Sequence, residues 1–276
     1  MHALRTAVAL VAALAFALPA AAQTKGYEPQ VGQAGKDVIW VPTPDEVVER
    51  MLRMAQTTKD DLVYDLGAGD GKIAIAAAKK FGARAVGIEY NPDMAKHAQS
   101  NTEKAGVAGR ARIIQGDIFV TDFSQATVVT MYLLPALNLK LRPTILAMKP
   151  GTRVVSHSFT MDDWDADETS NMDGRRAYFW LVPANVMGNW QLEAGAERFQ
   201  LSFEQRFQKI EGSVALGGTA SGGLRDARLR GAAIGFAFVD NNGVRRDYSG
   251  RVAGGRMEGT FRTEDGKEGR WSAAKK

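Results

Sequence analysis

The chain has 276 residues, 45% of them hydrophobic and 24% charged, which is the composition of an ordinary globular protein. The formal net charge of +4 comes without a long run of Lys or Arg, so charge alone does not establish nucleic-acid binding. Because the sequence contains no cysteine, disulfides, thiolate metal sites and cysteine nucleophiles are excluded.

Residues 1–22 have the order of a secretory signal peptide. Arg5 supplies a positive charge, residues 7–18 form an apolar run, and the three alanines before Gln23 are the small residues that a signal peptidase reads. The run is shorter than the roughly 20 residues of a comfortable membrane span. We expect cleavage before Gln23 and an exported, periplasmic protein with no membrane span; an uncleaved anchor is the alternative.

Residues 23–37 are polar and glycine-rich, and we expect a loose leader there. Residues 44–56 place apolar side chains at helical spacing, with Thr43 as the expected N-cap and Pro44 at the first helical position. Strands and helices then alternate, which is typical of a Rossmann-like, doubly wound and mainly parallel sheet. The expected strands are 62–66, 85–89, 111–115, 127–133 and 153–159, and the expected helices are 73–80, 92–105 and 137–148.

The pattern changes near residue 185, where helical periodicity gives way to short alternating runs separated by glycines. Asn241-Asn242-Gly243 and Asp265-Gly266 are hairpin signals. We predict two domains: the alternating strands and helices at 38–185, and a C-terminal antiparallel β-meander at 186–276, folded as a small barrel or sandwich. The expected strands are 199–207, 212–216, 227–229, 233–239, 246–250, 256–262 and 269–272.

A glycine-rich turn follows the first strand of the alternating region. Its sequence is Asp65-Leu66-Gly67-Ala68-Gly69-Asp70-Gly71-Lys72, and it opens a helix whose N-terminus favours negative charge. The spacing G-x-G-x-G differs from the G-x-G-x-x-G of dinucleotide binders, and Asp65 would repel a pyrophosphate. Both features argue against an NAD-type oxidoreductase.

Two further carboxylates follow the next strands. Glu89 can accept both ribose hydroxyls of an adenosine ligand, and Asp117 can accept from the adenine amino group while Ile118 packs on the ring. Taken singly, Asp65 could equally cap its turn, Glu89 could be solvated and Asp117 could be an ordinary loop residue. Their succession at the carboxyl ends of consecutive strands favours one shared site.

These motifs resemble the class I (seven-strand) S-adenosylmethionine-dependent methyltransferases, over roughly residues 40–164. The resemblance implies that Asp65 and the glycine turn hold the methionine moiety of S-adenosylmethionine. The cofactor-binding residues expected on this basis are Thr43, Asp65, Gly67, Ala68, Gly69, Gly71, Glu89, Tyr90, Asp117 and Ile118.

A narrower likeness rests on Val41-Pro42-Thr43-Pro44, the glycine turn, and Tyr132-Leu133-Leu134-Pro135. Together they look like the seven-strand protein-lysine methyltransferases, a group that includes enzymes acting on the c-ring protein of ATP synthase. Residues 128–159 resemble uncharacterised exported bacterial members of this group. The resemblance implies a protein side chain, with lysine as the leading candidate, or a small amine as the methyl acceptor.

Tyr132 follows the fourth strand, where class I enzymes place their acceptor-side motif, and His157 ends the fifth strand. Both are candidate catalytic residues, since an imidazole titrates near neutrality and can act on an acceptor proton. The alternatives are that Tyr132 ends a buried strand and that His157 is a hydrogen-bonded core residue. The Asn/Asp-Pro-Pro-aromatic signature of base methylation is absent, so we expect no nucleic-acid acceptor.

The function of two clusters of charged residues is left open by the sequence. The acidic run around Trp164 would attract a cationic lysine, close over the cofactor, or remain a solvated charge run; it comprises Asp162, Asp163, Asp165, Asp167 and Glu168. It lacks the order of a calcium loop, and we predict no metal. The C-terminal arginines suit an anionic partner or are scattered solubilising residues; they are Arg225, Arg228, Arg230, Arg245, Arg246, Arg251 and Arg256.

The leading hypothesis is therefore an exported S-adenosylmethionine-dependent methyltransferase. The alternative is a non-catalytic module that keeps an adenosyl pocket while its β domain binds a cell-envelope partner.

Overall fold

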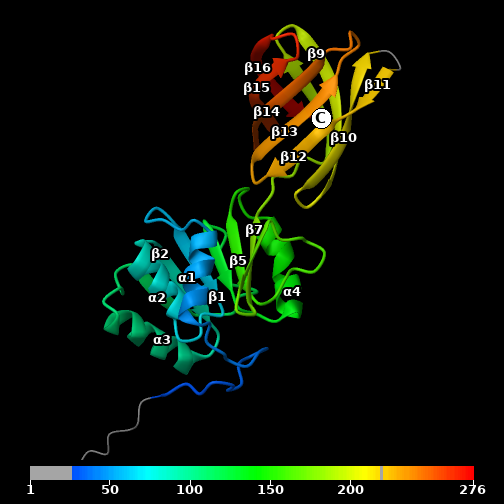
Figure 1. Ribbon diagram of the computed structural model, residues 1–276. Helices are drawn as coiled ribbons and strands as arrows, with labels where there is room; N and C mark the ends of the chain where they lie inside the picture. The colour runs from blue at the N-terminus through cyan, green and yellow to red at the C-terminus, as the bar shows by residue number, and fades with distance from the viewer. Residues whose placement is uncertain (1–26, 218–219) are drawn as a thin grey trace, which may run out of the picture.

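The computed structural model describes residues 27–217 and 220–276, which form two sheets with separate cores (Figure 1). The predicted signal peptide lies outside the described residues. Within the described residues, no helix is both long and apolar enough to cross a membrane.

The first sheet has seven strands in the order β3-β2-β1-β4-β5-β7-β6. Strands β1 to β5 run parallel, and β7 and β6 are antiparallel additions that the sequence pattern did not predict. The Rossmann-like, mainly parallel sheet is thereby confirmed. Its strands are β1 (Leu62–Leu66), β2 (Arg84–Glu89), β3 (Ala111–Gln115), β4 (Val128–Met131), β5 (Arg153–His157), β6 (Glu168–Met172) and β7 (Arg175–Leu181).

Helices cover both faces of this sheet. They are α1 (Asp45–Met54), α2 (Lys72–Phe81), α3 (Pro92–Lys104) and α4 (Pro135–Leu146). Buried residues of α1 and α2 pack with Val63, while α4 packs on the opposite face with Tyr64 and Leu66. Because both faces of a parallel sheet are buried, β1 carries apolar side chains on both faces, with Asp65 as the exception near its carboxyl end.

The start of α1 differs from the sequence prediction. The N-cap is Pro44 and makes no side-chain capping bond, whereas Thr43 is buried and its hydroxyl lies 3.2 Å from His157 Nδ1. The prediction that Thr43 caps the helix was wrong because a tertiary partner takes its hydroxyl. Pro135 likewise starts α4 earlier than expected, since proline fits the first helical position.

The second sheet has nine antiparallel strands in the order β11-β10-β9-β8-β16-β15-β14-β13-β12. Because β10 also contacts β12, the sheet curls into a nearly closed barrel around an aromatic core. Its strands are β8 (Gly188–Ala194), β9 (Glu197–Arg206), β10 (Lys209–Gly217), β11 (Ala220–Gly223), β12 (Arg225–Arg230), β13 (Ala233–Val239), β14 (Arg245–Ala253), β15 (Arg256–Thr263) and β16 (Glu268–Lys275). Independent folding of the two parts stays a prediction.

Two carboxylates of the acidic run form ion pairs at the junction of the two sheets. The β9–β10 turn places Phe207 against Trp164, with ring centroids 5.8 Å apart. Arg206 lies 3.0 Å from Asp163, and the ammonium of Lys209 lies 2.5 Å from Asp165. Asp163 and Asp165 thus form ion pairs across the junction, and their side chains remain 43% and 64% exposed to solvent.

The arginines of the C-terminal domain are not equivalent. Arg246 is buried and bonded to Glu197 and Asp240, and Arg245 pairs with Asp226 and Asp247. Two of the seven candidate arginines therefore have internal partners and do not offer free charge to an anionic ligand.

Candidate cofactor site

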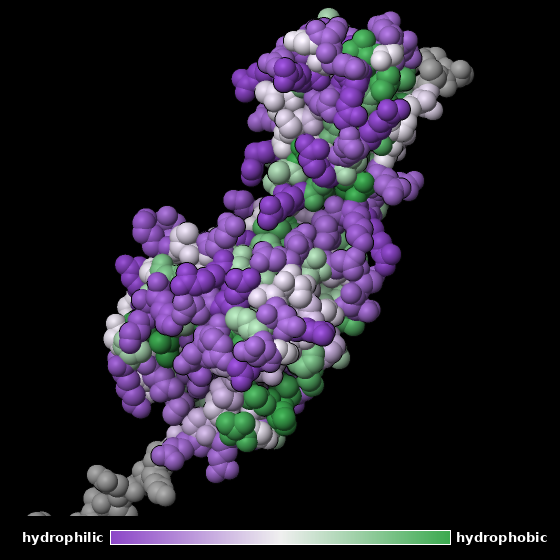
Figure 2. All heavy atoms as spheres, in the orientation of Figure 1, coloured by the Kyte–Doolittle hydropathy of each residue, from purple (hydrophilic) through white to green (hydrophobic). Residues whose placement is uncertain are grey.

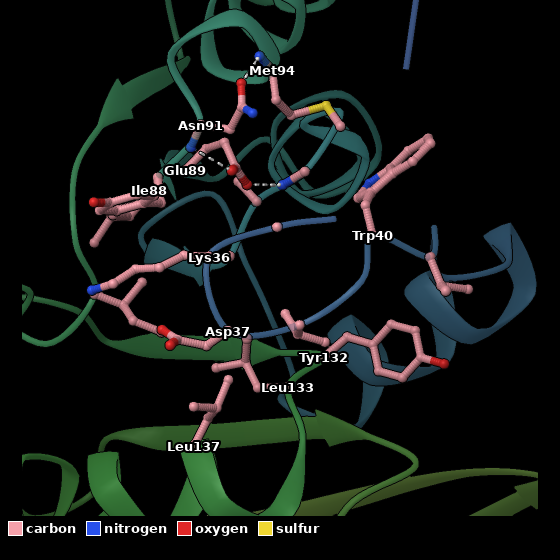
Figure 3. Close-up of a pocket in the computed structure, with 18 of the residues that line it drawn as sticks. Lys36, Asp37, Trp40, Ile88, Glu89, Asn91, Met94, Tyr132, Leu133 and Leu137 are labelled. Atoms are coloured by element: carbon pink, nitrogen blue, oxygen red, sulfur yellow. Dashed lines mark hydrogen bonds between the residues drawn. The ribbon is translucent and has the colours of Figure 1, made fainter. Parts of the chain in front are cut away.

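A cavity of about 310 Å³ opens at the carboxyl ends of β1, β2 and β4. The strand order reverses between β1 and β4, and open α/β sheets bind their ligands at such switch points. The predicted residues that line the cavity are Thr43, Asp65, Gly67, Ala68, Gly69, Glu89, Tyr90, Asp117, Ile118 and Tyr132. Gly71 and His157 lie outside the lining (Figure 3 shows part of the pocket).

The glycine turn is shaped by backbone conformations that other residues rarely adopt. Gly67 and Gly69 have φ angles of 80° and 54°. A Cβ on Gly69 would lie 2.4 Å from Trp40 Nε1, so the indole can approach only a glycine here. Gly71 is left-handed too and serves as the N-cap of α2. The turn therefore lies against the cavity with its backbone close to the ligand space, while Gly71 starts the helix.

Glu89 lies at the end of β2 and holds this turn in place. Its two carboxylate oxygens accept from the backbone N–H groups of Gly69 and Asn91, each at 2.9 Å (Figure 3). A carboxylate offers about four acceptor positions, so two remain for hydroxyl donors from a ligand. The same side chain thus joins the glycine turn to the predicted ribose position.

Asp65 is the most perturbed carboxyl group of the cavity. It is 2% exposed, and its Oδ1 accepts from the hydroxyl of Thr130 at 2.7 Å. The pKa of Asp65 is raised to about 7. Burial is the main cause, the hydrogen bond from Thr130 opposes it, and the negative charges of Asp70 and Glu89 add to it. A cationic ligand group beside Asp65 would restore the ionised form.

The last five residues of the predicted leader, 33–37, form part of the cavity wall. Residues 33–43 line the pocket, and backbone hydrogen bonds fold them back on themselves, including Trp40 N–H to the carbonyl of Gln33 at 2.9 Å. Lys36 crosses to Asp117 with an ammonium–carboxylate distance of 2.6 Å. That hydrogen bond and the N–H of Phe119 lower the pKa of Asp117.

The other end of the cavity is aromatic and apolar. Tyr132 lines it together with Leu134 and Phe159, and the rings of Tyr132 and Phe159 are stacked with centroids 6.2 Å apart. The His157 ring centroid lies 4.0 Å from that of Tyr132, and burial, helped by the charge of Arg175, lowers the pKa of His157 to about 4. His157 is therefore neutral near pH 7 and too weak a base to hold an acceptor proton there.

Sequence reasoning missed Trp40, Lys36 and Phe159. A tryptophan in a polar, glycine-rich segment beside Val41-Pro42 is a signal for packing, because so large an apolar side chain is seldom left in water. Nothing in the sequence pairs Lys36 with Asp117, which lies 81 positions away.

The donor set fits S-adenosylmethionine. Its cationic ammonium and sulfonium suit a buried carboxyl group, its ribose hydroxyls suit Glu89, and its amino acid carboxylate suits the helix N-terminus behind the glycine turn. Two observations support this fit. The glycine turn leaves no room for a Cβ at Gly69, and the pKa of Asp65 is raised.

Comparisons with known proteins agree with the site. A family model described as the ANTKMT methyltransferase domain matches residues 65–168. A protein-lysine N-methyltransferase of Saccharolobus islandicus (strain REY15A) is 50% identical over 138 residues, which cover 49% of this chain and 86% of the relative. A lysine N-methyltransferase of Mus musculus, named for the ATP synthase protein it modifies, is 34% identical over 132 residues, covering 48% of this chain and 53% of the relative.

Among solved structures, an RNA methyltransferase from Salinibacter ruber in complex with S-adenosyl-L-homocysteine is 50% identical. The match covers 53% of this chain and 96% of that one, with a TM-score of 0.52. All these relatives match about half of this chain or less.

Proposed function

Because the chain belongs to the class I S-adenosylmethionine-dependent methyltransferases, we propose that it methylates the side-chain amine of a protein lysine and does so outside the cytoplasm. The cofactor is S-adenosylmethionine, which supplies an electrophilic methyl group when bound. The observation that carries the proposal is the cavity itself, where a cofactor end rich in carboxylates continues into an apolar acceptor end.

The residues divide the work of holding the cofactor. Asp65 would face the methionine ammonium, and the N-terminal end of α2 would attract the methionine carboxylate. Glu89 would accept from the ribose hydroxyls and Asp117 from the adenine amine. Tyr90 and Ile118 line the same region and would cover the adenine ring.

At the acceptor end, the chain positions a nucleophile and excludes water. A lysine amine must be neutral to attack, and an apolar surrounding lowers the pKa of an ammonium. Tyr132, Leu134 and Phe159 provide that surrounding, and no dedicated base is needed once proximity and desolvation are supplied. His157 and Thr43 would act only by fixing the Tyr132 ring.

The surface near the cavity favours a protein acceptor over a nucleic acid. Ile39, Val41 and Leu134 line the cavity and are 58%, 38% and 41% exposed. Figure 2 shows apolar surface gathered at the end of this domain where the described chain begins. Such a rim suits the aliphatic stem of lysine, whereas phosphate backbones require clustered cations.

The test is methyl transfer from methyl-labelled S-adenosylmethionine to a cell-envelope extract of the source organism. We expect the labelled macromolecules to be degraded by protease and to resist nuclease. Acid hydrolysis of the labelled material should release methyl-lysine. Nuclease-sensitive label would refute the lysine acceptor. Cofactor binding without transfer to any fraction would favour the non-catalytic module.

Export is tested separately. The order of residues 1–22 supports a mature chain that starts near Gln23 in the periplasm of a Gram-negative host. Intact mass of the protein from the periplasmic fraction should lack Met1 to Ala22. A full-length mass in the membrane fraction would support the uncleaved anchor instead.

A further inference from the structure

Lys36 touches two of the groups expected to bind adenine. Its ammonium lies 2.6 Å from Asp117 Oδ2 and 4.7 Å from the centroid of the Tyr90 ring. It crosses the cavity from the leader toward the strand ends (Figure 3). Lys36 and Asp117 both line the cavity, where their side chains are 36% and 23% exposed.

The leader is folded so that Lys36 reaches this position. The N–H of Gly35 donates to the carbonyl of Val38 at 2.9 Å, and a Cβ on Gly35 would lie 2.4 Å from that oxygen. Trp40 then anchors the segment against Gly69. A glycine before Lys36 and a tryptophan after it thus fix the base of a long, otherwise mobile side chain.

The chemistry of the Lys36–Asp117 pair is specific. Asp117 uses Oδ1 for the N–H of Phe119 and Oδ2 for Lys36, which leaves one further acceptor position on each oxygen. An ammonium has three donors, and Asp117 takes one of them. The pair therefore presents a free donor beside a free acceptor, which is the complement of the adenine edge with its exocyclic amine and adjacent ring nitrogen.

We propose that Lys36 is a specificity residue for the cofactor, donating to N1 of adenine while Asp117 accepts from the exocyclic amine. The proposal rests on the proposed placement of adenine at Asp117. In this arrangement the leader recognises the base and closes the pocket in one contact. Hypoxanthine would be rejected, because its oxygen faces the carboxylate and its ring N–H faces the ammonium.

The test is calorimetric binding of S-adenosylhomocysteine and of its deaminated analogue, S-inosylhomocysteine. The full-length mature protein should prefer the adenosyl compound. Lys36→Met should weaken S-adenosylhomocysteine binding about tenfold or more, as expected for loss of a hydrogen bond to a charged group, and should reduce the preference over the inosyl compound. Lys36→Arg keeps a cationic donor and should restore part of both.

Lys140→Met is the matched control. Its ammonium lies 3.7 Å from the ring centroid of Phe119, and its charge also lowers the pKa of Asp117, but no hydrogen bond joins it to that carboxylate. Lys140→Met therefore removes a nearby charge without removing a donor to adenine, and it should keep the wild-type preference for the adenosyl compound. Thermal unfolding of each variant reports whether its fold is intact.

Equal or tighter binding of S-adenosylhomocysteine by Lys36→Met would overturn the proposal, because the lysine would then be a bystander or a competitor. An unchanged preference between the two ligands would overturn it as well. Failure of the lysine-methylation assay with these binding results intact would refute the proposed acceptor and leave the role of Lys36 standing.

Discussion

Asp65 should make cofactor binding depend on pH in a range where few carboxyl groups titrate. Burial raises its pKa to about 7 from 3.8, and a ligand cation beside it requires the ionised form. Binding must then expel a proton whenever the pH lies below 7. Apparent affinity should therefore fall as the pH falls.

The magnitude follows from the pKa. For one coupled proton and a pKa of about 7, the protein binds about tenfold more weakly at about pH 6 than at about pH 8. Calorimetry with S-adenosylhomocysteine in two buffers of different ionisation enthalpy measures both the affinity and the number of protons released. Asp65→Asn should bind more weakly at pH 8 and lose this pH dependence.

The same group has an opposite effect on stability. Its folded pKa lies above the unfolded value, so the contribution of the protonated form is complete below about pH 4 and is lost as the pH rises through 7. The three-unit shift corresponds to a penalty of up to about 4 kcal/mol at pH 8 in the ligand-free protein. Asp65→Asn, which still accepts from Thr130, should therefore raise the Tm at pH 8.

Two results would refute this reasoning. One is affinity for S-adenosylhomocysteine that stays constant between about pH 6 and about pH 8 with no proton release. The other is a lower Tm for Asp65→Asn at pH 8, which would mean that the ionised carboxylate has a stabilising partner in the free protein.

Three further predictions concern other parts of the molecule. Glu89→Ala should weaken cofactor binding by at most about 1.5–3 kcal/mol per hydroxyl contact, and unchanged affinity in the folded variant would exclude its ribose role. His157→Gln should lower kcat by loosening Tyr132 while the pH profile of kcat keeps its shape; loss of an acidic limb would instead make His157 a base. Truncation before Val186 should retain S-adenosylhomocysteine binding at a lower Tm, because Trp164 loses its contact with Phe207; aggregation would show that the two sheets need each other.

The cofactor end of the cavity was predictable because its carboxylates follow parallel strands. Asp65, Glu89 and Asp117 are local in sequence to their strands, and a parallel sheet brings those ends together. No long-range information is needed for that inference. The fold class was predictable for the same reason, since alternation of strands and helices is itself a local pattern.

The remaining features depend on contacts between distant residues. Lys36 meets Asp117, Thr43 meets His157 and Asp163 meets Arg206, and none of these partnerships leaves a periodic trace. The added strands β6 and β7 were missed although Asp173-Gly174 between them is a hairpin signal, with φ angles of 50° and 84° in the structure. A run of charged residues in a sequence is usually taken to be exposed to solvent, and only the three-dimensional structure shows which of these residues have an ion-pair partner.

The packing of Trp40 on the glycine turn gives the protein an optical reporter of its own cavity. Of its five tryptophans, Trp164, Trp180, Trp190 and Trp271 are buried, and only Trp40 is partly accessible to solvent. A soluble quencher such as iodide should therefore act mainly on the fluorescence of Trp40. Loss of quenching on addition of S-adenosylhomocysteine would follow occupation of the cavity in real time, without any label.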